Sequence, residues 1–253
     1  MFLKKILCLE DNYIYILYNI YNKCIIIDPG VSSPVIKFIN KNKLQPIAIL
    51  LTHKHIDHIQ GTYQLKNAFP NINIFGSSEI KNLFNIIPVN LNQKLNIDSF
   101  TFRVIFTPGH TKSHICYFIN PYLFCGDVIF YGGCGNFLKK NTISMYHSIT
   151  KLLTLPDQTI LCPGHEYSYQ NLFFAHKMFP FEKIIKKKWY KLKNNIQNYS
   201  LNTLEEEKKI NIFLRSNSIT LQKSVKKNFC YAWEFLWFLR EEKNKFNIKN
   251  LWS

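Results

Sequence analysis

The chain has 253 residues, of which 47% are hydrophobic and 19% are charged, so it is long enough to bury a large core and has the composition of a globular protein. No apolar run approaches the roughly 20 residues that a membrane-spanning helix needs, and we expect no membrane partner. The net charge of +16 is spread through lysine- and asparagine-rich surface turns such as residues 40–43. We interpret it as a bias of the whole composition and expect no nucleic acid partner.

The seven cysteines contain no CxxC pair, so the sequence predicts neither a disulfide framework nor a thiolate zinc site. The apolar stretch at residues 6–9 is too short for a secretory signal peptide. We therefore expect a cytoplasmic protein. Nothing in the sequence demands more than a monomer.

Short β-rich runs, bounded by Asn, Asp, Pro or Gly, fill the first two thirds of the chain. Helix-compatible stretches at residues 33–41 and 59–69 separate some of them, and residues 115–124 predict a hairpin that turns at Asn120-Pro121. The pattern is typical of a layered α/β domain. The predicted strands are residues 13–18, 24–27, 47–51, 72–75, 102–106, 115–119, 122–124 and 159–162.

From about residue 166 the sequence changes to longer segments with helical spacing, rich in Lys, Leu and Phe. Residues 182–195, 203–214 and 230–245 are predicted helices. We expect two domains, a catalytic domain at residues 1–165 and a smaller α-helical domain at residues 166–253.

The segment Thr52-His53-Lys54-His55-Ile56-Asp57-His58 directly follows the predicted strand at residues 47–51. It places four potential metal ligands within six residues, a pattern that chance produces in about 2 of 10,000 such chains. His53 and His55 at positions i and i+2 of an extended segment project the same way. Imidazole and carboxylate ligands suit zinc, iron or manganese better than calcium or magnesium. The alternative is a cluster of surface histidines.

Three further strand ends carry a possible ligand after a glycine, namely His110, Asp127 and His165. Each is weak alone, because a lone His or Asp after Gly is more often a turn residue. Together they supply the ligands that two metal ions would still lack after the first cluster.

With HxHxDH followed by His, Asp and His at strand ends, the sequence resembles the metallo-β-lactamase superfamily. The resemblance implies an αββα sandwich that holds two divalent metal ions at one edge, zinc or alternatively iron or manganese. Such a pair supplies a bridging hydroxide as nucleophile, which Asp57 would orient. The implied ligands are His53, His55 and His110 for one metal, Asp57, His58 and His165 for the other, and Asp127 as a bridge between them.

Within the superfamily, the segments TPGHTKSHICYF, YLFCGDVIFYGGCG and GHEYSYQNLFFA resemble glyoxalase II. The resemblance implies hydrolysis of a glutathione thioester, chiefly S-D-lactoylglutathione, to glutathione and D-lactate. It also implies that Tyr167 contacts the glutathione and that Arg240 and Lys243, three residues apart on one helix face, bind its glycine carboxylate. Asn136 stands where the family usually has a basic residue, and it can still offer a hydrogen bond.

Four alternatives remain at this point. A persulfide dioxygenase-like protein shares the fold but uses a single iron, and a nucleic acid processing hydrolase would fit the positive charge. A β-lactamase, or a binding protein that kept the fold and lost its activity, is also conceivable. The complete ligand set and the pair Arg240 and Lys243 favour the thioesterase.

Overall fold

The computed structural model describes residues 1–81, 85–193 and 201–250, the last four of these as backbone only. They fall into two compact units. The first unit consists of Met1–Thr107, Thr111–Gly126 and Cys162–Glu166, and the second of Pro108–His110, Asp127–Leu161 and the described part of Tyr167–Ser253. The second unit thus takes in residues 127–161 besides the C-terminal helices, and the boundary at residue 166 stays a prediction.

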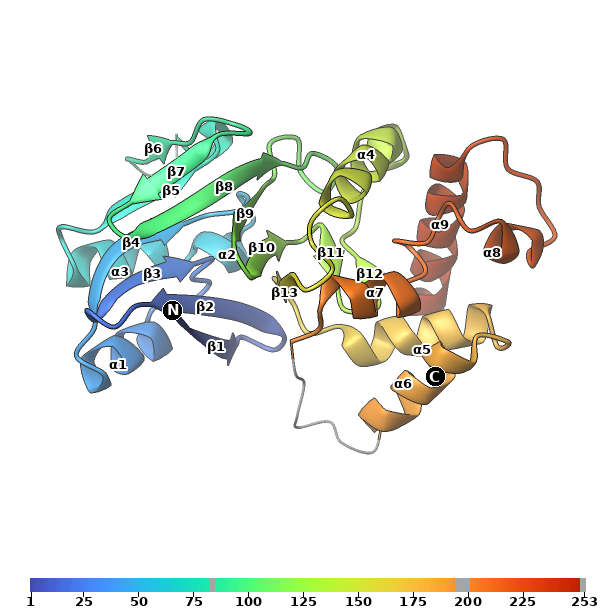
Figure 1. Ribbon diagram of the computed structural model, residues 1–253, viewed down its shortest axis with the longest axis horizontal. Helices are drawn as coiled ribbons and strands as arrows, with labels where there is room; N and C mark the ends of the chain where they lie inside the picture. Colours follow the sequence, from blue (N-terminus) through green and yellow to red (C-terminus); the bar gives the residue numbers. More distant parts are fainter. Residues whose placement is uncertain (82–84, 194–200, 251–253) are drawn as a thin grey trace. The chain divides into compact units, whose positions relative to one another are not determined.

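Two β-sheets carry the first unit (Figure 1). The first has the order β1-β2-β3-β4-β5-β6, antiparallel from β1 to β3 and parallel from β3 to β6. The second has the order β13-β10-β9-β8-β7 and is antiparallel from β10 to β7. The strands are β1 Phe2–Cys8, β2 Asn12–Tyr18, β3 Lys23–Ile27, β4 Gln45–Leu50, β5 Asn73–Gly76, β6 Ile87–Pro88, β7 Lys94–Ile97, β8 Phe100–Phe106, β9 Ile115–Ile119, β10 Tyr122–Gly126 and β13 Ile160–Pro163.

Strand β2 shows why the first sheet lies inside the unit. Ile14 and Ile16 belong to the core between this sheet and the helices. Tyr15 points the opposite way, where its ring lies 5.6 Å from that of Phe124 on β10 and its hydroxyl donates to Pro163 O at 2.9 Å. Because successive side chains alternate between faces, a strand buried on both faces is apolar throughout, which explains the run NYIYILY.

Short helices cover the outer face of the first sheet (Figure 1): α1 Ser33–Lys41, α2 Ile56–Ile59 and α3 Thr62–Ala68. α1 carries proline in its first turn, a position that lacks a helical hydrogen-bond partner in any case. Val35 and Ile39, one turn apart, are buried in the same core as Leu65 of α3. The first unit is therefore layered as helix, sheet and sheet.

The second unit is mainly helical. α7 begins with a capping box, in which Thr203 N donates to Glu206 Oε2 at 3.0 Å and Glu206 N to Thr203 Oγ1 at 3.3 Å. None of the described helices is long and apolar enough to cross a membrane. The elements are β11 Ile129–Phe130, β12 Gly133–Cys134, α4 Thr142–Leu152, α5 Ser168–Met178, α6 Lys183–Lys193, α7 Leu204–Ile210, α8 Ile219–Lys223 and α9 Ala232–Asn250, with one-turn 3₁₀ helices at η1 Ser78–Ile80 in the first unit and η2 Lys139–Asn141 in the second.

The predicted helix at residues 33–41 and the hairpin at residues 115–124 are confirmed. Three helix predictions were wrong in extent. The predicted helix at residues 230–245 begins at Ala232 and continues to Asn250. The stretch 59–69 is interrupted, since α2 ends at Ile59 and α3 begins at Thr62. The stretch 203–214 stops at Ile210, because Asn211 turns to an extended backbone. Residues 194 and 195 of the predicted helix 182–195 lie outside the described residues.

Candidate metal centre and substrate pocket

The HxHxDH motif folds as the turn between β4 and α2. His55 has an extended backbone (φ −64°, ψ 142°) and immediately precedes α2, so Asp57 and His58 lie in the first turn of that helix. His165 follows β13 on a loop fixed by the bond from Gly164 N to Gly126 O at 2.9 Å. Two segments more than 100 residues apart thus contribute to one cluster.

Asp57, His58 and His165 have their ligand atoms together in the first unit. The Nε2 atoms of His58 and His165 are 3.2 Å apart, and Asp57 Oδ2 lies 3.6 Å from the first and 3.3 Å from the second. In a tetrahedral zinc site with bonds of about 2.0–2.1 Å, neighbouring ligand atoms are about 3.3–3.4 Å apart. The three atoms therefore fit three corners of a metal site.

Carboxylates orient both imidazoles of this cluster. His58 Nδ1 lies 3.1 Å from Asp28 Oδ2, and His165 Nδ1 lies 2.7 Å from Asp11 Oδ1. A carboxylate accepts a hydrogen bond, so in each ring the Nδ1 atom carries the hydrogen. The Nε2 atom then keeps its lone pair, which points toward the other imidazole ring. Two lone pairs 3.2 Å apart repel each other unless a cation or a proton lies between them.

Asp28 and Asp57 are themselves held in place. Asp28 accepts from the backbone N of Thr52 at 2.8 Å and from its Oγ1 at 2.6 Å. Asn12 Nδ2 donates to Asp57 Oδ2 at 2.9 Å. The close imidazole of His165 and the hydrogen bond from Asn12 hold the pKa of Asp57 well below its usual range against the opposing effect of its partial burial. Asp57 is therefore a carboxylate at neutral pH.

His53 and His55 lie beside this cluster in the first unit. The ring centroid of His53 is 4.6 Å from that of His55 and 4.2 Å from that of His58. Gly126 leaves room for Thr52 next to His53, because a Cβ on it would lie 2.5 Å from Oγ1 of Thr52, and its φ of +46° suits glycine. All five residues predicted as ligands in this unit thus gather at one end of the sheets.

The two remaining predicted ligands, His110 and Asp127, meet within the second unit. His110 Nε2 lies 3.3 Å from Asp127 Oδ2, and its Nδ1 donates to the backbone O of Asn136 at 2.7 Å. A Cβ on Gly135 would lie 1.8 Å from Asp127 O, so only glycine fits there. One peptide bond joins each of the two residues to the first unit, at Thr111 and at Gly126.

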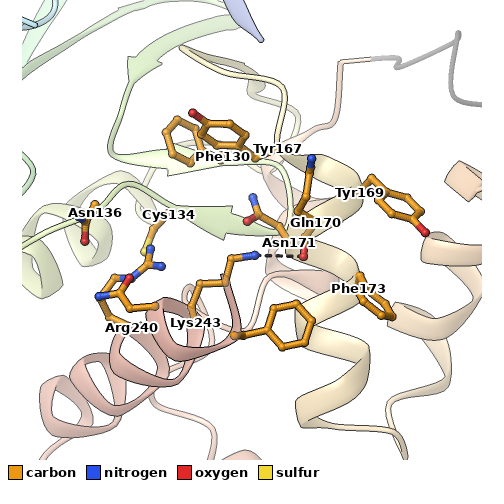
Figure 2. Close-up of a pocket in the computed structure, with 12 residues that line it drawn as sticks. Phe130, Cys134, Asn136, Tyr167, Tyr169, Gln170, Asn171, Phe173, Arg240 and Lys243 are labelled. Atoms are coloured by element: carbon orange, nitrogen blue, oxygen red, sulfur yellow. Dashed lines mark hydrogen bonds between the residues drawn. The ribbon is translucent and has the colours of Figure 1, made fainter. Parts of the chain in front are cut away.

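A pocket of about 710 Å³ lies in the second unit, within the size range of small-molecule sites (Figure 2). The predicted substrate residues Tyr167, Asn136, Arg240 and Lys243 all line it. The ring of Tyr167 stands edge-on to that of Phe130 at 5.2 Å. The further lining residues are Cys134, Tyr169, Gln170, Asn171, Phe173, Asn244 and Phe246.

Arg240 and Lys243 are buried cations, 5% and 4% exposed, that project from α9 toward Cys134 (Figure 2). Neither forms an ion pair with a described residue, and Lys243 Nζ donates to Gln170 O at 3.0 Å. Burial, together with the neighbouring Arg240, lowers the pKa of Lys243 to about 7. Two desolvated cations with no acid beside them in the described part of the chain form a site for an anion.

Sequence reasoning missed Asp11, Asn12 and Asp28, which orient the predicted ligands. A signal for Asp28 was present, because Asp28-Pro29-Gly30 places an acidic residue at a strand end two positions from a glycine, much as Gly126-Asp127 does. Asp11 and Asn12 lie in a turn between strands, where such residues are common for local reasons. Nothing in their spacing points to His165.

Residues 12–95 and 91–165 match the model of the metallo-β-lactamase superfamily, and residues 166–246 match that of the hydroxyacylglutathione hydrolase C-terminus. A hydroxyacylglutathione hydrolase of Buchnera aphidicola subsp. Schizaphis graminum (strain Sg) is 44% identical over 97% of this chain and 100% of its own length. The one of Erwinia tasmaniensis is 39% identical, again over 97% of this chain and 100% of its own.

Among solved structures, ETHE1 from Myxococcus xanthus is similar in fold, with a TM-score of 0.66, 23% identity, and 90% of this chain and 92% of that chain covered. This likeness, together with the superfamily match, confirms the predicted metallo-β-lactamase fold. The chain belongs to the hydroxyacylglutathione hydrolase family, also called glyoxalase II, within the metallo-β-lactamase superfamily.

Proposed function

We propose that the chain is a dinuclear metal-dependent thioesterase that hydrolyses S-D-lactoylglutathione to glutathione and D-lactate. The observation that carries the proposal is the pair Arg240 and Lys243, two buried cations that line a pocket of suitable size and face no acid among the described residues. A glutathione thioester has the anionic carboxylates that such a pair binds. The two relatives named above match this chain over their full length, and both are named hydroxyacylglutathione hydrolase.

The proposed metal ligands form two sets. The fit of Asp57, His58 and His165 to a metal site supports the second set. Chain connectivity supports the contribution of the second unit, because His110 and Asp127 are each bonded to a residue of the first. Bound there, divalent metal ions lower the pKa of water and polarise a thioester carbonyl. The sets are His53, His55 and His110 for one ion and Asp57, His58 and His165 for the other, with Asp127 shared; zinc, iron and manganese all suit these donors.

The chain's own side chains position the reactants in this proposal. Asp57, a carboxylate at neutral pH, accepts a proton of the attacking water and so orients it. Arg240 and Lys243 bind the glycine carboxylate, and the hydroxyl of Tyr167 donates to the glutathione backbone. The leaving thiol has a pKa of about 8.5, so it departs as a thiolate without a strong general acid.

We also propose that residues 166–253 form the glutathione-binding domain. Residues 127–161 contribute one wall of its pocket. All seven cysteines are free thiols and six are buried, which supports a reducing, cytoplasmic location. We propose a monomer, because the proposed reaction requires no residue beyond those named in this chain.

Steady-state hydrolysis of S-D-lactoylglutathione by the metal-loaded protein tests the proposal, with metal content measured on the same sample. We expect thioester cleavage that requires about two metal ions per chain. A protein that holds two metal ions and cleaves no glutathione thioester would contradict the proposed function. Metal analysis of protein purified without added metal identifies the ions.

A further inference from the structure

The strands β11 and β12 form a two-stranded hairpin that builds one wall of the pocket. Phe130 and Cys134 line the pocket from the hairpin itself, and Asn136 does so from just beyond it (Figure 2). Each strand has two residues, paired as Ile129 with Cys134 and Phe130 with Gly133. A ladder this short is not stable by itself. Other parts of the second unit must hold it.

Helix α7 supplies that support from Glu207 and from Asn211, the residue that ends the helix one turn later. Glu207 Oε2 accepts from the backbone N of Gly132 at 2.8 Å. Asn211 Nδ2 lies 3.1 Å from Phe130 O and 2.8 Å from Gly133 O, and so donates to both strands of the hairpin. Both side chains belong to residues with no exposed surface.

The orientation of these two side chains is fixed by further bonds. Asn211 Oδ1 accepts from Phe213 N at 3.1 Å, which turns the amide nitrogen toward the hairpin and toward Glu207 Oε2 at 3.0 Å. Asn202 Nδ2 donates to Glu207 Oε1 at 2.7 Å. Every described partner of Glu207 is a donor, so the position suits a carboxylate, which only accepts. Burial raises the pKa of Glu207 to about 7, so its charge is held at a free-energy cost.

The hairpin also leads to His110. Asn136, two residues after β12, accepts the hydrogen bond from His110 Nδ1 at 2.7 Å. A shift of the hairpin therefore moves the pocket wall and changes the acceptor that orients this imidazole. On the opposite side, Asn171 Nδ2 donates to Tyr131 O at 3.0 Å and packs against Gly133.

We infer that Glu207 and Asn211 are positioning residues that hold the β11–β12 hairpin where Phe130, Cys134 and Asn136 line the substrate pocket. The inference rests on the proposed function insofar as it names a glutathione thioester as the occupant. Neither residue reaches the pocket itself, since neither is among its lining residues. They act through the peptide groups of the hairpin.

The test compares Glu207→Gln with Glu205→Gln in the metal-loaded, full-length protein. Both variants remove one carboxylate from α7, but the side chain of Glu205 is 45% exposed and forms an ion pair only with Lys209 among the described residues, at 2.6 Å. In Glu207→Gln the amide nitrogen faces a donor whichever way the amide turns, either Asn202 Nδ2 or Gly132 N together with Asn211 Nδ2. The readouts are hydrogen exchange of peptides covering residues 128–137, the dissociation constant of glutathione, and KM and kcat for S-D-lactoylglutathione.

For Glu207→Gln we expect faster exchange in residues 128–137 and an increase on the order of tenfold in both KM and the dissociation constant. Glu205→Gln should match the wild type. Asn202→Ala serves as a control for lost stability, because it removes a donor to Glu207 and leaves the bond to Gly132. It should lower Tm without the change in KM.

If Glu207→Gln does not fold, Asn211→Ser provides the second variant, since it leaves Glu207 its bonds to Gly132 and Asn202. It should show the same pattern with a smaller change. Exchange in residues 128–137 and KM at wild-type values in the variants would overturn the inference. A wild-type protein that neither binds glutathione nor cleaves the thioester would contradict the proposed function instead. Hydrogen exchange would still show whether Glu207 holds the hairpin in place.

Discussion

The Nε2 atoms of His58 and His165 lie 3.2 Å apart, although 107 positions separate the two residues in the chain. Each ring has its other nitrogen against a carboxylate, Asp28 for His58 and Asp11 for His165. These carboxylates make both Nε2 atoms acceptors, which is an arrangement that a metal ion stabilises and a single proton satisfies only in part. The binding of a cation here is therefore coupled to residues that do not touch it.

Replacing Asp28 with Asn should weaken metal binding 10- to 100-fold, because the amide no longer fixes the tautomer of His58. The measurement is the metal content left after titration with a chelator. Asp98→Asn serves as the matched control, since Asp98 is an exposed residue of the first unit that pairs with Lys23. Equal metal retention in the two variants would contradict a role of Asp28 at the metal centre.

The sequence predicted the strands that end at the ligands. In each of them an apolar run is followed by Gly, Asp or Pro, and these residues end a strand for local reasons. Five strands escaped prediction, namely the edge strands β1, β6 and β7 and the pair β11 and β12. β1 mixes exposed and buried residues without regular alternation, and β7 has one buried residue among four. Their pairing comes from the neighbouring strands β2 and β8, which local pattern does not reveal.

The candidate site could be predicted as far as its ligands and substrate contacts, because these stand in recognisable motifs. The residues that orient them could not. Glu207 lies in the run Leu204-Glu205-Glu206-Glu207, where three adjacent acids look alike in the sequence. Only the fold shows that Glu205 faces solvent, Glu206 caps the helix and Glu207 is buried against Gly132.

A lysine at position 136 should strengthen binding of the glutathione thioester. Asn136 is exposed at the rim of the pocket, and a cation there attracts an anionic substrate at a solvated position. We expect Asn136→Lys to lower KM by up to about fivefold at low salt and less at high salt. The backbone O of Asn136 keeps its bond to His110 in the variant. Asn136→Met is the uncharged control, and an equal change in KM for both would rule out an effect of charge.

Binding of the substrate carboxylate should be coupled to protonation of Lys243. Burial, aided by Arg240, lowers the pKa of Lys243 to about 7 in the ligand-free protein, whereas the nearby Cys134 acts weakly in the other direction. A bound carboxylate raises that pKa again. Above about pH 7 the complex therefore takes up a proton, and affinity falls with rising pH by at most about tenfold per pH unit.

Calorimetry of S-methylglutathione binding near pH 8, in buffers of different ionisation enthalpy, measures this uptake. The expected result is uptake of up to one proton, which Lys243→Met abolishes. Lys245→Met should behave as the wild type, because Lys245 is exposed and pairs with Glu242 at 2.7 Å. Binding of the wild type without proton uptake at that pH would show that Lys243 is already charged in the free protein.

We expect Arg240 to lower the stability of the folded protein although it strengthens the binding of glutathione. Its Nε has no hydrogen-bond partner among the described residues, and burial lowers the pKa of the guanidinium. Removing an unpaired buried charge is stabilising. Arg240→Met should therefore raise the Tm of the ligand-free protein and weaken glutathione binding by about 10- to 100-fold.

Arg215→Met provides the contrast, because Arg215 donates to both oxygens of Glu182, at 3.0 and 2.8 Å, and stands outside the pocket. That variant should lower Tm, since it leaves Glu182 largely buried without its cation, and should leave glutathione binding unchanged. Thermal melts and binding titrations on both variants separate the two roles. If Arg240→Met lowered Tm as much as Arg215→Met does, Arg240 would have to be paired with an acid within the folded chain. Its charge would then not be available to the proposed anionic substrate.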